Sequence, residues 1–339
     1  MNNWQSISAE RQRIIVENIS AHTGFSPEAI EKDWWVTMVL KALFQTSCAD
    51  YLVFKGGTSL GKCWKLIERL SEDIDVAIFR IFFGISEIST KNQREKLRKA
   101  SSKYIQDQLI NELDEKLKAF DISAYKIELE ETDSSDIDPR VIFVNYPSLF
   151  PESKYLKSSV KIEISCRSLY EPNESIELRS IIAENYPNEL FADKSFIVKA
   201  VSPMRTFLKK VFLLHEALQK GRVHSMRMTR HLYDLHKLMD TDYAKKALDD
   251  SALYQMIVKH RSIMTREKGV DYSTLCPSKI SFIPENEDII DIWKKDYKNM
   301  YETFIGEIPI EFEDLMERMK VLLSRFRSIT IDESFFTNL

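Results

Sequence analysis

The chain has 339 residues, a formal net charge of −4, and a composition that is 44% hydrophobic and 29% charged. This balance is that of an ordinary globular protein with an ample core, and it excludes a low-complexity chain. Because no run of about 18 apolar residues occurs and the N-terminus has no signal-peptide pattern, we expect a cytoplasmic protein without a membrane partner. The four cysteines are widely separated, and neither they nor the six histidines form a disulfide or metal-binding pattern.

The first fifty residues predict two helices. Ser8 is placed to cap the first helix and Gly24 to end it. Ser26 is placed as the N-cap of the second helix, followed by proline at the first helical position. This helix runs toward Phe44, and its two adjacent tryptophans are expected in the core, since aromatic residues at helical spacing usually pack inward.

A strand followed by a diglycine turn comes next. The apolar run from Leu52 ends at the turn, and an amphipathic stretch continues as a helix through Trp64 to Ile67. Free amide groups at the start of such a helix hold phosphate oxygens. We therefore predict that the turn binds a triphosphate through these nucleotide-binding residues: Lys55, Gly56, Gly57, Thr58 and Ser59.

Two aspartates stand at the mouth of the following strand. Asp73 and Asp75 are two residues apart, and the strand period of two points both side chains to the same face. Two like charges at this spacing repel unless a cation lies between them, and Mg²⁺ takes few protein ligands together with several phosphate oxygens. The pair is therefore predicted to bind Mg²⁺, with Mn²⁺ as the alternative, and nearby Ser71 to contact the nucleotide.

Neither motif is specific by itself. Most diglycine pairs are only turns, and an Asp-x-Asp is more often a solvated strand end than a metal site. In this order, separated by the length of one helix, the two motifs together indicate a nucleotidyltransferase type of site.

The middle of the chain alternates between a long helix and short strands. Residues 80–89 are apolar and ambiguous, and the apolar spacing from Lys91 to Lys118 fits one long amphipathic helix. Strand-like runs follow at 125–129, 141–145, 160–165 and 195–200. In the third run, Lys161, Glu163 and Ser165 share one face, so Glu163 is either a third carboxylate of the metal site and a proton acceptor, or a charged residue facing water.

After residue 202 the pattern is helical almost to the end, with breaks near Gly221, 269–277 and 306–309. The segment 205–237 holds eight basic and two acidic residues, which makes it a candidate contact surface for phosphates or, alternatively, a solvated helix pair. Lys210 borders an apolar stripe, where a sheltered lysine suits a fixed contact to a β- or γ-phosphate.

A later helix is predicted to carry four polar residues at i,i+4 spacing. The pairs are Arg227 with His231 and Arg230 with Asp234. His231 is a candidate base, because the unperturbed pKa of histidine is about 6.5. Asp234 is either catalytic or an ion-pair partner of Arg230 within the helix.

Several blocks of the sequence resemble the AbiEii/AbiGii toxin family of nucleotidyltransferase-like proteins. The resemblance is carried by Lys-Gly-Gly-Thr-Ser-Leu at 55–60 and Ser-Glu-Asp-Ile-Asp at 71–75, and it extends to blocks at 31–35, 161–165, 204–207 and 230–235. It implies a nucleotidyltransferase core with a mainly helical C-terminal half. It also implies a toxin of a toxin–antitoxin or phage-defence pair, with a cognate antitoxin as a partner. Some relatives in this family modify tRNA at its 3′ acceptor end.

The resemblance assigns roles and also marks two departures. The motif lysine of the family aligns with Lys210, and the block around Glu163 supports its place in the site. Relatives commonly have an acidic residue before this lysine, where this chain has Lys209, and an aspartate in the position of His231. The first departure removes an orienting carboxylate, and an imidazole cannot copy a carboxylate's role toward a metal.

We therefore predict an α+β fold with a small mixed sheet, divided into N-terminal helices (1–50), a nucleotidyltransferase core (51–202) and a helical C-terminal lobe (203–339). The predicted reaction transfers a nucleoside monophosphate from a nucleoside triphosphate to an RNA hydroxyl, with tRNA as the expected acceptor. Catalysis is assigned to Asp73, Asp75, Lys210, His231, Asp234 and Glu163, and nucleotide contacts to the turn with Ser71, Lys210, Arg227 and Arg230. The alternatives are a protein or small-molecule hydroxyl as acceptor, or a nucleotide- or partner-binding module without turnover.

Overall fold

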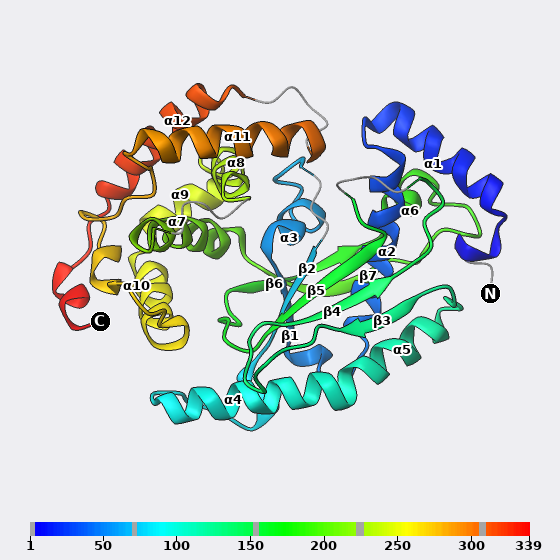
Figure 1. Ribbon diagram of the computed structural model, residues 1–339, viewed down its shortest axis with the longest axis horizontal. Coiled ribbons are helices and arrows are strands. Elements are labelled where there is room, and N and C mark those ends of the chain that lie inside the picture. The colour runs from blue at the N-terminus through cyan, green and yellow to red at the C-terminus, as the bar shows by residue number, and fades with distance from the viewer. Residues whose placement is uncertain (1–3, 70–72, 152–155, 222–226, 305–309) are drawn as a thin grey trace. The chain divides into compact units, whose positions relative to one another are not determined.

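The computed structural model describes residues 4–69, 73–151, 156–221, 227–304 and 310–339 (Figure 1). By their internal contacts the residues form two units. The first consists of Met1–Cys63 and Leu70–Val201, and the second of Trp64–Arg69 and Ser202–Leu339. The mixed α and β content confirms the predicted α+β class, whereas the division at residues 50 and 202 stays a prediction.

The two predicted N-terminal helices are present with the predicted caps. Helix α1 spans Ala9–Thr23 and α2 spans Pro27–Leu43. Ser8 Oγ accepts a hydrogen bond from the Arg11 amide, and Gly24 ends α1 with φ 77°, a left-handed conformation that glycine adopts without strain. Helix α2 is buried along nearly its whole length and contacts α5, β2 and β5.

A seven-stranded mixed sheet forms the centre of the first unit, in the order β3-β4-β5-β2-β1-β7-β6 within the described residues. Strand β1 pairs with β7 and β2 with β5 in parallel, and the other neighbours are antiparallel. The strands are β1 (Leu52–Lys55), β2 (Asp73–Ile78), β3 (Lys126–Leu129), β4 (Arg140–Asn145), β5 (Ser159–Ser165), β6 (Asn173–Leu178) and β7 (Phe196–Val201). Strand β6 and the short helix α6 (Ile181–Asn185) are not predicted from the sequence.

The helix after the diglycine turn is shorter than the sequence predicts. Helix α3 spans only Gly56–Lys62, and Lys65 has a positive φ of 52°, which a continuing helix does not allow. The predicted continuation through Trp64 to Ile67 is therefore wrong. Residues 64–69 instead belong to the second unit, where the Trp64 ring contacts Tyr243 at a centroid distance of 5.5 Å.

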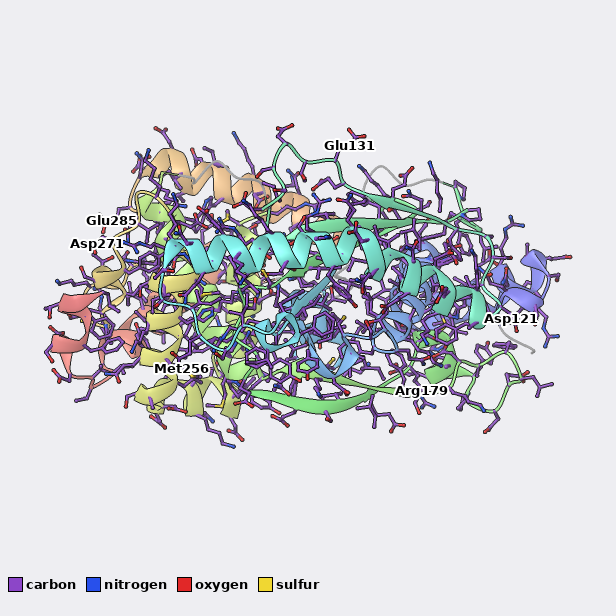
Figure 2. All side chains as sticks on the ribbon, turned by 90° about the horizontal axis from the view of Figure 1, so that it is seen from below. Asp121, Glu131, Arg179, Met256, Asp271 and Glu285 are labelled. Carbon is purple, nitrogen blue, oxygen red and sulfur yellow. The ribbon has the colours of Figure 1, made fainter. Side chains whose placement is uncertain are left out.

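The long amphipathic helix is confirmed, with one irregular turn. Helix α4 (Lys91–Tyr104) and α5 (Ile110–Ala119) are joined by a π-helical turn over Ile105–Leu109. The predicted apolar stripe from Leu97 to Leu117 is buried. Viewed from below, α4 and α5 lie in front of the sheet (Figure 2). The ambiguous segment before them forms a 3₁₀ turn over Arg80–Phe83.

The described part of the second unit, apart from residues 64–69, is helical with irregular connections. Its helices are α7 (Pro203–Gln219), α8 (Thr229–Leu238), α9 (Asp242–Asp249), α10 (Ser251–His260), α11 (Glu287–Phe304) and α12 (Phe312–Arg327). A π turn at Arg261–Thr265 extends α10, and 3₁₀ turns form at Tyr272–Leu275 and Glu333–Asn338. In the described residues of both units, no helix has the length and apolar character needed to cross a bilayer.

Candidate active site

Asp73 and Asp75 point to the same face of the sheet. They are the first and third residues of β2, and buried Ile74 between them points to the opposite face. In the pairing register, Asp75 lies beside Lys55 of β1 and Glu163 of β5, and Asp73 lies beside Lys161. The strand spacing therefore brings the two carboxylates and the third predicted carboxylate, Glu163, onto one face.

The diglycine turn lies directly against Asp75. Gly56 has φ 82°, and a Cβ atom built on it would lie 2.1 Å from Asp75 Oδ2, far inside contact distance. Only glycine fits this conformation and this space. Lys55 Nζ lies 3.6 Å from Asp75 Oδ1, whose side chain is 28% exposed. The turn and the carboxylate thus form one local structure, as a phosphate and metal site requires.

The start of α3 joins the two motifs. Lys55 is its N-cap residue, without a side-chain hydrogen bond to the cap, and Gly56 and Gly57 open the helix. Thr58 Oγ1 donates a hydrogen bond to the Asp73 carbonyl oxygen at 2.5 Å. Ser59 is 2% exposed, and its hydroxyl has no hydrogen-bond partner among the described residues. Ser71 lies outside the described residues.

Glu163 is held by its neighbour on the same strand. Its Oε1 lies 2.5 Å from Lys161 Nζ, and the side chains are 30% and 34% exposed. Burial acts to lower the pKa of Lys161, but the bond to Glu163 outweighs it and the pKa is raised. Glu163 is therefore on the predicted face, and it is neither a fully solvated residue nor a free carboxylate.

The donor set fits a hard divalent cation bound by two carboxylates. No group of three or more His, Cys, Asp or Glu side chains in the described parts of the chain is arranged to hold a metal ion. Mg²⁺ does not need such a cage, since it is usually held by one or two carboxylates together with substrate phosphates and waters. Asp73 and Asp75 are half-exposed and lie beside the diglycine turn, so they could supply the two carboxylates while a phosphate at the turn supplies further oxygen ligands.

Asp234 occupies a different environment, inside the second unit. It is fully buried, accepts two hydrogen bonds from Arg69, from Nε at 2.6 Å and Nη2 at 2.8 Å, and lies 2.6 Å from Lys210 Nζ. Burial alone would raise the pKa of this carboxyl, but the two cations hold it well below the ordinary range. The suggested ion pair with Arg230 within the helix is not the arrangement found, and Arg69 was not among the predicted site residues.

Lys210 and His231 complete this buried cluster. Lys210 is 7% exposed, and burial lowers its pKa although Asp234 opposes the shift. Its Nζ lies 3.3 Å from His231 Nδ1. Burial, followed by the charges of Lys210 and Arg230, holds the pKa of His231 well below 6.5, so the imidazole is neutral near pH 7 and is a weak base.

The predicted helical face that pairs Arg227 with His231 is wrong. Helix α8 begins at Thr229, and Arg227 precedes it with a positive φ of 74°. The reason is an N-terminal cap supplied by another helix. Asp296 of α11 accepts hydrogen bonds from the Arg227 and Thr229 amides at 2.7 and 3.0 Å. Arg230 is half-buried in the first turn of α8.

The block Glu31-Lys32-Asp33 has a structural role that the sequence did not reveal. Glu31 accepts hydrogen bonds from Ser148 Oγ and the Leu149 amide, at 2.6 and 2.8 Å, and burial raises its pKa. Lys32 Nζ donates to a backbone carbonyl at 3.0 Å. Asp33 forms an ion pair with Lys62 at the end of α3 and accepts a hydrogen bond from the first amide of α6 at 2.8 Å. The polar block thus ties α2 to α3. The sequence did contain a signal for this role, because three consecutive charged residues within an otherwise apolar helix need polar partners when they are buried.

A comparison with protein families gives one match. The model described as nucleotidyl transferase AbiEii toxin, type IV TA system, matches residues 39–318, which include every predicted site residue of both units. The chain matches no protein of curated function.

Proposed function

Because this chain belongs to the AbiEii family of nucleotidyl transferase toxins of type IV toxin–antitoxin systems, we propose that it transfers a nucleoside monophosphate from a nucleoside triphosphate to an RNA hydroxyl and releases pyrophosphate. The proposed acceptor is the 3′ end of tRNA. A cognate antitoxin is the expected protein partner. In the reaction the acceptor oxygen forms a bond to the α-phosphorus, the bond from that phosphorus to the pyrophosphate oxygen breaks, and the hydroxyl proton passes to a base or to water.

The observation that carries the proposal is the contact between the Gly56 turn and Asp75. Asp73 and Asp75 are proposed to hold Mg²⁺, or Mn²⁺, which when bound would neutralise phosphate charge. The amides that open α3 and the ammonium of Lys55, 3.6 Å from Asp75, are placed to bind phosphate oxygens. Ser59 offers a hydroxyl that is not engaged by a described residue.

The roles proposed for the second unit differ in how well its geometry supports them. Lys210 is proposed to offset charge on the leaving pyrophosphate, with Arg230 or Arg227, but its ammonium is already paired with Asp234. Asp234 is better suited to hold Arg69 and Lys210 in place than to accept a proton, since a carboxylate between two cations has a depressed pKa. Glu163 remains the candidate base, because a carboxylate can accept the proton of the acceptor hydroxyl once it is released from Lys161.

The proposed RNA contact surface is smaller than the sequence indicates. Of the basic residues in 205–237, Arg205 and Lys210 are buried, and Arg222 lies outside the described residues. Lys237 pairs with Glu68 at 2.9 Å. Lys209 and Arg230 are half-buried and Arg227 is exposed, and we propose that these three contact RNA phosphates.

The reaction is tested with labelled nucleoside triphosphates, Mg²⁺, and either total RNA or lysate protein as acceptor. The proposal expects label in tRNA with the wild type and none with Asp73→Ala or with chelator. Sequencing of tRNA 3′ ends from cells that express the two proteins would identify the added nucleotide. Label in the protein fraction, or equal label with Asp73→Ala, would contradict the proposed acceptor or the proposed metal site, respectively.

A nucleotide-binding module without turnover is the second candidate. The state of the predicted bases favours it, because Glu163 is bonded to Lys161, Asp234 to two cations, and His231 has a lowered pKa. This candidate expects Mg²⁺-dependent nucleotide binding while pyrophosphate release stays at the background rate with every acceptor fraction.

A further inference from the structure

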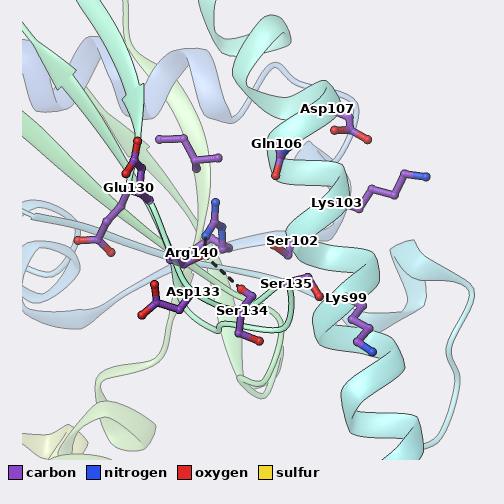
Figure 3. Close-up of a pocket in the computed structure, with 13 residues that line it drawn as sticks. Lys99, Ser102, Lys103, Gln106, Asp107, Glu130, Asp133, Ser134, Ser135 and Arg140 are labelled. Carbon is purple, nitrogen blue, oxygen red and sulfur yellow. Dashed lines mark hydrogen bonds between the residues drawn. The ribbon is translucent and has the colours of Figure 1, made fainter.

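An open groove of about 880 Å³ lies beside α4, around Arg140 (Figure 3). It is bounded by α4 and the π turn on one side and by β4 and residues 129–135 on the other. In the register, Arg140 pairs with Ile164, whereas Glu163 and Asp75 point to the other face. The groove is therefore separate from the candidate active site. Its volume is within the range of small-molecule sites, about 300 to 1,000 Å³.

A buried guanidinium without an acidic partner lines this groove. Arg140 is 5% exposed, and its one hydrogen bond to the described residues runs from Nη1 to Thr132 Oγ1. Its Nε has no partner, and no carboxylate of the described residues lies within ion-pair distance of it. A buried charge of this kind is costly unless an anion compensates it. The nearest acids in sequence are used elsewhere, since Asp136 binds Arg98 at 2.6 Å and Asp138 binds Arg167 at 2.5 Å.

The polar groups around Arg140 can hydrogen-bond a ligand. The Gln106 side chain extends from the π turn toward the groove, and the buried Ser102 hydroxyl lies one turn before it (Figure 3). Π turns within helices occur frequently at functional sites. The ion pair between Arg98 of α4 and Asp136 holds the helix to the loop, so the groove has two fixed walls.

The groove is lined by exposed groups of both charges. Glu130, Glu131 and Asp133 are exposed on the loop side, and Lys99 and Lys103 of α4 on the other. The three carboxylates can accept hydrogen bonds from hydroxyl or amino groups, and Arg140 offers one position for a phosphate. A ligand with one phosphate and a polar body that carries donors therefore matches this lining.

We propose that this groove is a second ligand site that binds a nucleoside monophosphate, with its phosphate on Arg140 and its sugar and base along Gln106 and the three exposed carboxylates. The site does not depend on the proposed transfer reaction, because Arg140 points to the sheet face opposite to Asp75 and the groove contains no proposed metal ligand.

The proposal is tested by calorimetry with AMP, GMP, CMP and UMP in chelator, on the full chain carrying Asp75→Ala to suppress binding at the candidate active site. We expect one site for at least one nucleotide, with inorganic phosphate as a weaker competitor. Gln106→Glu adds a negative charge to the wall of the groove and should weaken binding of the anionic ligand about 10-fold or more. Gln108→Glu, an exposed residue of the same turn, is the matched control and should leave binding unchanged.

Arg140→Gln should abolish binding while the circular dichroism spectrum stays that of a folded chain. If this variant does not fold, the Gln106 and Gln108 pair decides the question. The proposal is overturned if none of the four nucleotides binds, or if Gln106→Glu binds as tightly as Gln108→Glu. Inorganic phosphate binding as tightly as every nucleotide would likewise overturn it.

Discussion

Two aspartates in different parts of the molecule show how environment decides what a carboxylate can do. Asp75 in the first unit is 28% exposed, lies against a glycine turn, and has one ammonium at 3.6 Å. Asp234 in the second unit is fully buried, with a guanidinium and an ammonium within 2.8 Å. Asp75 retains the capacity to bind a ligand cation, whereas the charge of Asp234 is already neutralised by Arg69 and Lys210.

The difference separates a binding role from a positioning role. Arg69, which Asp234 holds, stands four residues before Asp73 in the chain. Asp234 holds Arg69 in place within the second unit. Asp234 thus anchors both Arg69 and Lys210 in that unit.

The largest expected effect is on stability, from Asp234→Ala. The substitution leaves Arg69 and Lys210 buried without their counter-charge, so we expect a loss of about 3 to 5 kcal/mol in the free energy of unfolding. Asp240→Ala is the matched control. Asp240 also binds two arginines, Arg318 and Arg325, but it is 54% exposed, and its loss should cost about 1 kcal/mol or less. Urea unfolding of both variants measures the difference. Equal losses would contradict the account of the buried cluster.

The next effect is on activity, from Asp75→Asn. It keeps the shape of the side chain and removes the charge, so the rate of pyrophosphate release should fall about 1,000-fold, or about 4 kcal/mol, with little change in stability. Glu128→Gln on the exposed edge strand β3 controls for the loss of a carboxylate from the same sheet face. A rate within about threefold of the wild type for Asp75→Asn would exclude the assigned role.

A pair of glycine variants isolates the contact between turn and carboxylate. Gly56 and Gly84 both have positive φ, 82° and 71°, so alanine should strain the backbone at either position by about 1 to 2 kcal/mol. Only at Gly56 does the new methyl group meet Asp75, because nothing lies within 4 Å of the corresponding point at Gly84. We expect similar melting temperatures for the two variants and a loss of Mg²⁺-dependent activity for Gly56→Ala alone. Full activity in Gly56→Ala would show that the close approach is dispensable.

The smallest effect is the pH dependence of stability between about pH 7 and 5. The pKa of His231 is lower in the folded chain than the unfolded value of about 6.5, so the unfolded chain binds more protons as the pH falls. The contribution of neutral His231 to stability is complete above the unfolded pKa of about 6.5, and it is lost as the pH falls from there to the lower folded pKa. His215, whose pKa burial also lowers, acts in the same direction. Asp234 acts only at lower pH, since its depressed pKa preserves its contribution until the pH falls below about 4.

His231→Asn should therefore flatten the decline of melting temperature from pH 7 to 5. The same substitution at His22, which is exposed on α1, serves as the control and should leave the slope unchanged. A slope as steep in His231→Asn as in the wild type would contradict the assignment.

Local signals predicted much of the first unit from the sequence. Ser8, Gly24 and Ser26 act as the caps that their residue types indicate, and the period of two in β2 and β5 placed Asp73, Asp75 and Glu163 on one face. These features depend on neighbours in the chain or on a regular repeat. The same logic failed at α3, because the positive φ at Lys65 and the contacts of Trp64 with the second unit override a helical apolar spacing.

Partners that are distant in the chain were not predictable from one sequence. The bond between Arg69 and Asp234 spans 165 residues, and the cap that Asp296 provides to α8 spans 67. Arg69 lies beyond the predicted helix and carried no prediction, and no periodicity marks a buried ion pair. Strand β6 was missed because its residues, Asn173–Leu178, alternate weakly and are mostly polar, as suits an exposed edge strand.

The most direct test of the central claim is a crystal structure with Mn²⁺ and a non-hydrolysable nucleoside triphosphate, with the metal located by anomalous scattering. The account predicts a metal peak about 2.1 Å from carboxylate oxygens of both Asp73 and Asp75, with triphosphate oxygens at the Gly56 turn. A metal bound away from both aspartates, or a triphosphate that leaves the turn empty, would contradict it.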